Sequence, residues 1–278
     1  MTMPIDLVLV RHGQSEQNIA LHAAKSGNTK LVSDPRFLAR PASDHPLTKL
    51  GRKQAQLAGE WLRKHDLGRF DRRYSSAYVR AMQTAALLDT EGPAWYVDPT
   101  LREREWGDHD SLSWEKRESL EESALLKRDA NSFYWIPANG ESIAQLTVRL
   151  ARLLDTLHRE CSDKRVLIVC HGEVMWAFRF MLERMSIEEW MQLEASQDPR
   201  HKIHNCQIIH YTRRNPSTGE LEPHLNWRSS ICPTDETLSD SSWQAIRRKT
   251  YTNDELLRMA DKVSQIYNYD DEGEVLIA

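Results

Sequence analysis

Long hydrophobic runs are missing from this sequence of 278 residues. A membrane-spanning helix needs roughly 18 or more apolar residues in succession, and no segment of the chain approaches that length. The apolar stretch near the N-terminus, Ile5–Val10, is interrupted by Asp6 and is too short for the apolar part of a secretory signal. We therefore expect a cytoplasmic protein that has no membrane partner.

An excess of charge of one sign is also lacking, because 37 Lys and Arg side chains are balanced by 41 Asp and Glu side chains, a net charge of −4. This balance is not typical of a nucleic-acid-binding domain, so we expect no nucleic-acid partner. Walker A and GxGxxG motifs are absent, which excludes the common phosphate-binding loops for ATP and dinucleotides.

Cysteine is scarce, and its spacing contains no CxxC pair. The pattern predicts buried, reduced thiols rather than a disulfide framework or a zinc ribbon. The pair His201 and His204 lies close to Cys206 in sequence but matches no common structural zinc pattern, and we expect no metal. The four cysteines are Cys161, Cys170, Cys206 and Cys232.

Two short runs that are apolar on both faces, Leu7–Val10 and Val166–Cys170, predict buried parallel strands. Between them, Glu141–Cys161 carries apolar residues at steps of three and four residues, which predicts an amphipathic helix. Alternating strands and helices predict a three-layer α/β fold with helices on both faces of a mostly parallel sheet. The other expected elements are strands at Arg72–Ser75 and Cys206–Tyr211 and helices at Thr48–Trp61, Tyr78–Leu88, Val174–Met185 and Asn253–Tyr267.

Two segments interrupt this alternation. His22–Asp44 is rich in turn formers and predicts a loop, whereas His109–Asn139 is polar and partly helical. The second segment contains Trp114 and the aromatic run Phe133–Trp135, which predict either a small satellite core or a segment that covers a site. The acidic stretch Asp270–Glu274 predicts a solvated tail.

A histidine followed by a glycine stands at the end of each expected central strand, His12-Gly13 and His171-Gly172. Ligands of open α/β sheets bind at the carboxyl ends of the strands, so both histidines should reach the same edge. Arg11 precedes the first histidine, and Arg80 follows the strand expected at 72–75. Because the guanidinium fork suits phosphate geometry, these side chains predict an anion pocket. We expect both glycines to permit close approach of the backbone and a positive φ.

Six motifs follow one another along residues 5–212: Arg11-His12-Gly13-Gln14-Ser15 with Asn18, Pro46-Leu47-Thr48-x-x-Gly51, Ser76-x-x-x-Arg80-Ala81-x-Gln83-Thr84, Leu101–Gly107, Gly140-Glu141-Ser142, and His171-Gly172. Together and in this order they resemble the histidine phosphatase superfamily, also called phosphoglycerate mutase-like proteins. The resemblance implies a catalytic domain over residues 1–212, with inserts at about 22–44 and 109–139. Residues 213–278, which carry none of these motifs, would form a C-terminal extension that packs on the core or trails from it.

The resemblance implies that His12 is the nucleophile and forms a phosphohistidine with a small phosphorylated substrate, without cofactor or metal. Arg11 and Arg80 would hold the phosphoryl oxygens, and His171 would donate to the same oxygens in the transition state. Cys170 is an alternative nucleophile. A phosphate-binding cysteine loop needs an arginine close behind the cysteine, but the next arginine here, Arg179, is nine residues away, which is too far. Because Cys170 also ends an apolar strand, we expect a buried, inert thiol.

Glu103 matches the family's general acid and base, a role that requires partial burial to raise the pKa of its carboxyl group. Glu105 is the close alternative. Asn18 would contact the phosphate or, as the second interpretation, cap the following helix. The remaining residues that we expect at the phosphate or at the rim of its pocket are Gly172, Gln14 and Ser15.

The positions after the second His-Gly pair distinguish the branches of the family. Mutases usually have Asn-Ser-Leu-Arg there, whereas this chain has Glu173, Val174, Met175 and Trp176. A carboxylate and a tryptophan at the two ends of this stretch disfavour a second anion, so the resemblance favours a phosphatase that hydrolyses phosphomonoesters. The alternatives are a phosphoglycerate mutase-type isomerase and a catalytically silent phosphate-binding regulatory protein. The oligomeric state stays open.

Overall fold

The chain divides into two units, Met1–Arg247 and Arg248–Ala278. The structure, a computed structural model, describes residues 2–110, 132–269 and 275–277. The smaller unit contains helix α9 (Asn253–Ala260) and a two-stranded sheet of β8 (Tyr267–Tyr269) and β9 (Val275–Ile277). The helix expected at 253–267 is therefore shorter, and the chain forms a strand at its expected end. The acidic stretch 270–274 lies outside the described residues.

The larger unit is built on a seven-stranded sheet with the order β3-β2-β4-β1-β5-β6-β7. Its strands are β1 (Asp6–Arg11), β2 (Arg72–Ser76), β3 (Tyr96–Asp98), β4 (Arg165–Cys170), β5 (Ile208–Thr212), β6 (Trp227–Ile231) and β7 (Asp240–Ala245). The first four strands pair in parallel, whereas β5, β6 and β7 add through antiparallel pairs. The α/β class is confirmed, and the expected parallel pairing holds for β1 to β4, while the last three strands make the sheet as a whole mixed. The reason is that no crossover helix separates β5, β6 and β7, and only antiparallel neighbours can be joined without one.

Strands β6 and β7 lie beyond residue 212, where the resemblance placed the end of the catalytic domain. They nevertheless continue the central sheet, and β6 pairs with β5 from Ile208↔Ile231 to Thr212↔Trp227. Part of the expected C-terminal extension is thus built into the larger unit. The sequence shows no apolar run here because β6 carries polar side chains in its middle and β7 is mostly exposed.

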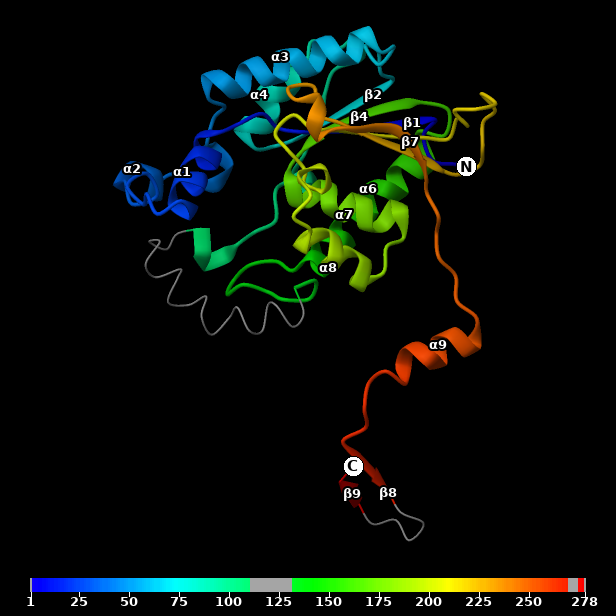
Figure 1. The fold of residues 1–278 in the computed structure, drawn as a ribbon. Coiled ribbons are helices and arrows are strands. Elements are labelled where there is room, and N and C mark those ends of the chain that lie inside the picture. Colours follow the sequence, from blue (N-terminus) through cyan, green and yellow to red (C-terminus); the bar gives the residue numbers. More distant parts are fainter. Residues whose placement is uncertain (1, 111–131, 270–274, 278) are drawn as a thin grey trace. The chain divides into compact units, whose positions relative to one another are not determined.

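Helices cover both faces of this sheet, α3 and α4 on one face and α6, α7 and α8 on the other (Figure 1). Two short turns, α2 and η1, lie within the segment expected as the loop 22–44. The helices of the larger unit are α1 (Glu16–Lys25), α2 (Pro35–Leu38), α3 (Lys49–Lys64), α4 (Val79–Leu87), α6 (Ile143–Glu160), α7 (Gly172–Glu183) and α8 (Ile187–Ala195). The 3-10 turns are η1 (Ala42–Asp44), η2 (Pro99–Leu101), η3 (Gly107–Asp110), η4 (Pro199–His201) and η5 (Glu236–Leu238).

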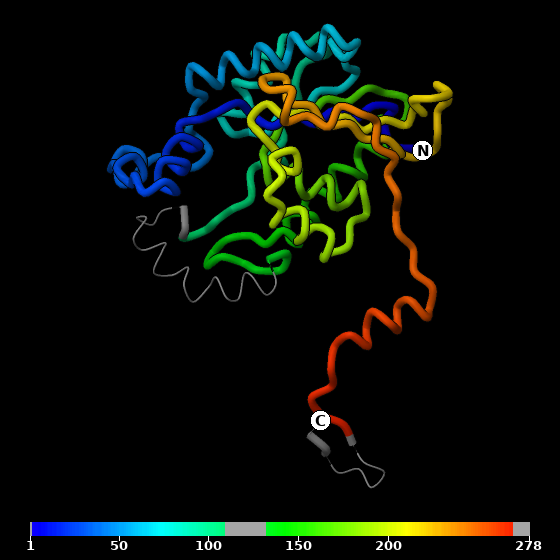
Figure 2. Tube along the Cα trace, in the orientation of Figure 1, coloured from blue at the N-terminus to red at the C-terminus, as the bar shows by residue number. Residues whose placement is uncertain are grey.

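Strand β1 lies in the middle of the core and is surrounded by segments from much later in the sequence (Figure 2). Its alternate side chains enter the two apolar layers, Leu7 and Leu9 against α6 and α7, and Val8 and Val10 against α3 and α4. All four side chains are completely buried. The end of β1, where the expected site begins, is therefore held from both faces.

The predicted stripe of α6 is confirmed, because the residues that recur at steps of three and four are all buried: Ile143, Leu146, Leu150, Leu153 and Leu157. The four cysteines are buried free thiols. Most of the segment 109–139 lies outside the described residues, Trp114 included, while Phe133 packs into the main core against Phe180 and Trp190. Within the described part of the chain, no helix is both long and apolar enough to cross a membrane.

Candidate active site

The carboxyl ends of β1, β2 and β4 bring the two predicted histidines together. Arg11 pairs in register with Cys170, so His12 and His171 follow at the same edge of the sheet. Their ring centroids are 5.1 Å apart, and the rings meet edge to face. Arg80, in the first turn of α4, donates from Nε to His12 Nε2 at 3.1 Å. The side chains form one buried cluster, in which His12, His171 and Arg80 are 2%, 0% and 3% exposed.

His12 has a defined tautomer. Its Nδ1 donates to the carbonyl oxygen of Gly13 at 2.7 Å, so the lone pair of the ring resides on Nε2. Burial, and then the positive charges of Arg80 and Arg11, lower the pKa of His12 well below its ordinary value of 6.5. At neutral pH this ring is therefore an uncharged imidazole with its lone pair directed to the side of Arg80.

His171 is held by a hydroxyl group from β2. Its Nε2 forms a hydrogen bond of 2.8 Å with Ser76 Oγ, which also accepts a hydrogen bond from the backbone of Tyr78. The other ring nitrogen, Nδ1, is a buried atom that has no hydrogen-bond partner among the described residues. Burial, followed by Arg80, also lowers the pKa of His171 well below 6.5.

The two arginines are anchored by backbone carbonyls. Arg80 donates to Ala42 O at 2.6 Å and lies over the Tyr78 ring, 4.9 Å from its centroid. Arg11 donates to Ile203 O at 2.6 Å, while its buried Nε has no partner in the described part of the chain. Since Ala42 belongs to η1, the segment expected at 22–44 reaches the cluster and helps to orient Arg80.

Glu103, rather than Glu105, has the environment that a general acid requires. Glu103 Oε1 accepts a hydrogen bond from the backbone of Arg104 at 3.0 Å. Burial raises the pKa of Glu103 above its ordinary value, although the charges of Arg80 and Arg11 oppose the shift. Glu105 is 49% exposed in its side chain and forms an ion pair with Arg102 at 2.7 Å.

The other predicted rim residues make structural hydrogen bonds. Ser15 and Asn18 form a reciprocal cap of α1, in which Ser15 N donates to Asn18 Oδ1 at 3.1 Å and Asn18 N donates to Ser15 Oγ at 3.3 Å. Gln14 Oε1 accepts from the Thr48 hydroxyl at 2.9 Å. The geometry thus matches the capping interpretation of Asn18, and a phosphate contact from this residue stays a prediction.

The role expected for the two glycines is wrong in one respect, because neither Gly13 nor Gly172 has a positive φ. Gly13 is needed for a different reason. A Cβ at this position would lie 2.3 Å from Gly51 O, and a Cβ at Gly51 would lie 2.0 Å from Gln14 O. The loop after His12 and the start of α3 therefore pack backbone against backbone. A Cβ at Gly172 would meet Arg11 Nε at 3.5 Å, an ordinary contact.

Three supporting residues carry no clear role in the sequence. Besides Ser76, Thr84 Oγ1 accepts from the backbone of Gly13 at 3.0 Å, and Asn205 Nδ2 donates to His12 O at 3.1 Å. Ser76 and Thr84 both belong to the family motif that contains Arg80, and this membership is the feature of the sequence that could have marked them as site residues. Asn205 lies in the turn before β5, and its contact depends on the antiparallel pairing of β5 with β1.

Cys170 is completely buried, and burial raises the pKa of its thiol far above the ordinary value. A thiol in this state is a poor nucleophile, which agrees with the inert role expected for it. In the ranges that the structure describes, no three His, Cys, Asp or Glu side chains gather in a geometry that could hold a metal ion.

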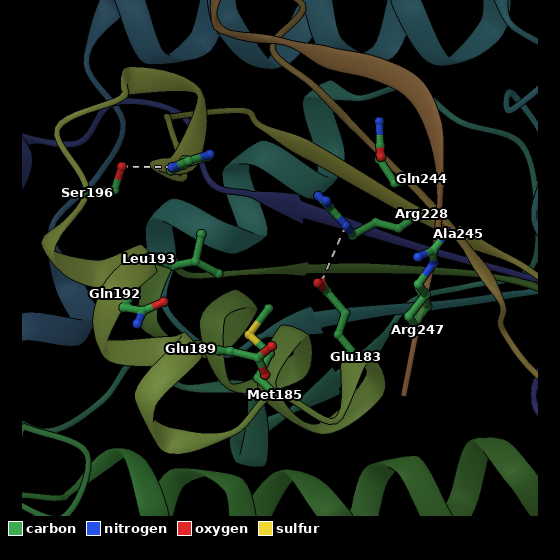
Figure 3. A pocket seen from close by; sticks show the side chains of 12 residues that line it. Glu183, Met185, Glu189, Gln192, Leu193, Ser196, Arg228, Gln244, Ala245 and Arg247 are labelled. Atoms are coloured by element: carbon green, nitrogen blue, oxygen red, sulfur yellow. Dashed lines mark hydrogen bonds and ion pairs between the residues drawn. The ribbon is translucent and has the colours of Figure 1, made fainter. Parts of the chain in front are cut away.

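A cavity of about 480 Å³ lies elsewhere, between α7, α8 and the strands β6 and β7 (Figure 3). It contains none of the predicted site residues. Its wall includes Glu183, which accepts from Arg179 Nε at 3.0 Å and from the Tyr211 hydroxyl at 2.8 Å, and lies 3.5 Å from Arg228 Nε. This largely buried charge network joins α7 to β5 and β6.

The fold and the cluster together define the class of protein: an α/β protein that gathers histidines and arginines where the strands of its sheet end. A family model described as the histidine phosphatase superfamily (branch 1) matches residues 7–218. The chain belongs to this superfamily, and the resemblance seen in its motifs is confirmed.

Relatives of known activity include both mutases and phosphatases. The 2,3-bisphosphoglycerate-dependent phosphoglycerate mutase of Methylorubrum populi is 31% identical over 196 residues, which covers 68% of this chain and 84% of the relative. The mycobacterial glucosyl-3-phosphoglycerate phosphatase, solved in complex with VO3, is 25% identical with a TM-score of 0.56, covering 74% of this chain and 92% of that chain. A phosphoserine phosphatase from Entamoeba histolytica shares the fold at 23% identity, with a TM-score of 0.53 and coverage of 75% and 91%.

Proposed function

We propose that this protein is a phosphomonoester hydrolase that acts on a small phosphorylated metabolite through a phosphohistidine at His12, without a metal ion. The observation that carries the proposal is the pairing of an uncharged, buried imidazole with a carboxyl group of raised pKa, Glu103, under the influence of the same two arginines, Arg80 and Arg11. Two buried nitrogen atoms, Arg11 Nε and His171 Nδ1, have no hydrogen-bond partner among the described residues. Phosphoryl oxygens would accept from Arg11 Nε, and from His171 Nδ1 in the tautomer or charged form that carries a proton there.

In the first step, the Nε2 lone pair of His12 attacks phosphorus and forms the N–P bond while the bond from phosphorus to the ester oxygen breaks. The leaving oxygen takes the electron pair and receives the proton of Glu103, which becomes a carboxylate. The phosphorylated ring is cationic, and the Gly13 carbonyl, which accepts from Nδ1, stabilises it. Arg11, Arg80 and the N-terminal N–H groups of α7 disperse the negative charge on the phosphoryl oxygens.

In the second step, water replaces the alcohol. The Glu103 carboxylate takes a proton from the water molecule while its oxygen attacks phosphorus, and the N–P bond breaks. The electron pair returns to His12 Nε2, and phosphate leaves. Each group is then in its starting state, which closes the catalytic cycle.

Mutase activity is the second candidate, because sequence relatives at 31% identity are phosphoglycerate mutases. A mutase must hold a doubly phosphorylated intermediate and therefore needs positive charge beyond the transferred phosphate. In this chain the first turn of α7 carries Glu173, whose side chain is 28% exposed, at the position after His171-Gly172. A carboxylate there repels a second anion, which favours hydrolysis.

The test uses the full chain, para-nitrophenyl phosphate and a metal chelator. We expect turnover by the wild type and its loss in His12→Ala, while His158→Ala, an exposed histidine of α6, retains the wild-type rate. Acid-labile phosphate should be trapped on the wild type and not on His12→Ala. Interconversion of phosphoglycerates with a bisphosphate primer, in place of hydrolysis, would assign a mutase. Vanadate binding without any turnover would assign a silent phosphate-binding protein.

A further inference from the structure

A second cluster, made of Arg104, Glu173, Trp106 and Trp135, lies next to the catalytic residues. Arg104 Nη1 is 3.9 Å from Glu173 Oε2, and the guanidinium carbon lies 4.6 Å from the Trp106 ring centroid and 5.8 Å from that of Trp135. Arg104 follows Glu103 in sequence and binds its carboxylate through the backbone. Both ends of the cluster are thus tied to the site, one at the general acid and one at the start of α7. We call these four residues the Arg104 cluster.

The guanidinium group of Arg104, the positive charge of the Arg104 cluster, is already engaged by partners within the protein. Arg104 Nε donates to Glu141 O at 2.7 Å, and its Nη2 donates to Trp135 O at 3.2 Å. Its side chain is 5% exposed, against 28% for the carboxylate of Glu173. The more accessible partner of the ion pair is therefore the anion.

The neighbouring arginines are also engaged. Arg102 is paired with Glu105, and Arg149 is paired with Glu141 at 2.8 Å. Among the described residues around the Arg104 cluster, the charges that act on Glu173 are those of Arg104, Glu103, Glu194 and Arg11. The two cations among these four groups are Arg104, which is paired with Glu173 itself, and Arg11, which belongs to the proposed phosphoryl site.

We propose that the Arg104 cluster is the leaving-group subsite and that it selects phosphate esters of neutral polyhydroxy alcohols, including sugars, over esters whose alcohol carries a carboxylate or a second phosphate. This inference rests on the proposed hydrolase function. A neutral ion pair offers both donors and acceptors, which matches hydroxyl groups that donate and accept. The half-buried indole rings of Trp106 and Trp135 add an apolar surface for the carbon skeleton.

The state of Glu173 depends on pH. Burial, opposed by Arg104 and assisted by Glu103, raises the pKa of Glu173 to about 7. A carboxyl group is ionised above its pKa, so an assay at pH 8 measures the charged form and an assay at pH 6 the neutral form. Discrimination against anionic alcohols should therefore be stronger at pH 8.

A matched pair of substrates tests the inference. Glycerol 3-phosphate and 3-phosphoglycerate share the carbon skeleton and the phosphate, and they differ in a hydroxymethyl group against a carboxylate. At pH 8 we expect the wild type to favour glycerol 3-phosphate by about tenfold or more in kcat/KM. Glu173→Gln, which keeps the shape and removes the charge, should reduce this ratio by about fivefold or more, mainly through a lower KM for 3-phosphoglycerate.

Two variants control the interpretation. Glu105→Gln removes an exposed carboxylate of the same neighbourhood and should keep the wild-type ratio. Glu173→Asp retains the charge and should retain most of the discrimination, whereas a purely structural role would make it resemble Glu173→Gln.

The outcomes separate the two proposals. If the wild type hydrolyses para-nitrophenyl phosphate but shows equal kcat/KM for the matched pair, or if Glu173→Gln leaves the ratio unchanged, the assignment of the leaving-group subsite is overturned and the hydrolase function stands. If the wild type hydrolyses none of the three esters, both proposals are overturned.

Discussion

Replacement of Glu103 by glutamine is the sharpest test of the proposed chemistry. Glutamine retains an oxygen that accepts from Arg104 N, so the backbone contact at 3.0 Å can persist. It cannot donate a carboxyl proton to the leaving oxygen. The variant therefore separates the proton transfer from the local structure.

The expected magnitude depends on the leaving group. General acid catalysis contributes roughly 10²–10⁴ in rate, equivalent to about 2.7–5.4 kcal/mol of activation free energy. An alkyl ester such as glycerol phosphate needs the proton because an alkoxide is a poor leaving group, so Glu103→Gln should lose that whole factor. Nitrophenolate is stable as an anion, and its ester should lose less than about tenfold.

The assay measures kcat/KM for both esters across pH. Because burial raises the pKa of Glu103, the fraction that carries the acidic proton falls as the pH rises through that pKa. The wild-type rate for the alkyl ester should fall with it. The variant should lack this alkaline decline. Glu105→Gln should behave as the wild type, since its carboxylate is exposed and paired with Arg102.

Equal losses with the two esters in Glu103→Gln would refute the assignment, because they would show that the residue acts on the phosphoryl group or on folding rather than on the leaving oxygen. A loss of the same size in Glu105→Gln would move the acid to that position. A thermal melt of each variant distinguishes unfolding from lost chemistry.

Three further predictions follow from the contacts of the site and of the core. Ser76→Ala removes the hydroxyl that holds His171 at 2.8 Å, so we expect kcat to fall about tenfold with little change in KM, as measured by steady-state kinetics. Glu183→Gln should lower the free energy of unfolding in urea by roughly 3–5 kcal/mol near neutral pH, because it leaves the buried Arg179 without its anion. Burial raises the pKa of Glu183 but its cationic neighbours outweigh this and lower it, so its contribution to stability is complete above about pH 4.3 and is lost as the pH falls through the lower folded-state pKa. Gly51→Ala should reduce both stability and activity, because the new Cβ would lie 2.0 Å from a backbone oxygen of the loop after the nucleophile; an unchanged melting temperature would contradict the contact.

Short-range patterns account for what the sequence determined by itself. The apolar runs Leu7–Val10 and Val166–Cys170 predicted buried strands, and the structure places them side by side with every one of these side chains buried. The 3.6-residue period of α6 predicted its buried stripe. Because parallel strands present their carboxyl ends at one edge, these two strands were also enough to bring His12 and His171 together.

Tertiary structure decided what depends on contacts between distant segments. The sequence left Glu103 and Glu105 as alternatives. The folded structure distinguishes them, because it desolvates the carboxyl group of Glu103 and leaves that of Glu105 exposed to solvent. Strands β6 and β7 have weak apolar patterns, so their addition to the sheet follows from pairing with β5 and not from local periodicity.

The cationic cluster illustrates the same division. A net charge of −4 gave no indication of where positive charge would gather, although the motifs predicted which residues would gather it. The pairing of Arg104 with Glu173 could not be read from the sequence, because the two residues are 69 positions apart and meet only when α7 and the segment between η2 and η3 are both in place. Periodicity and motif order act within a few residues, whereas the protonation state and availability of a charged group depend on its whole surroundings, and only the folded chain defines those.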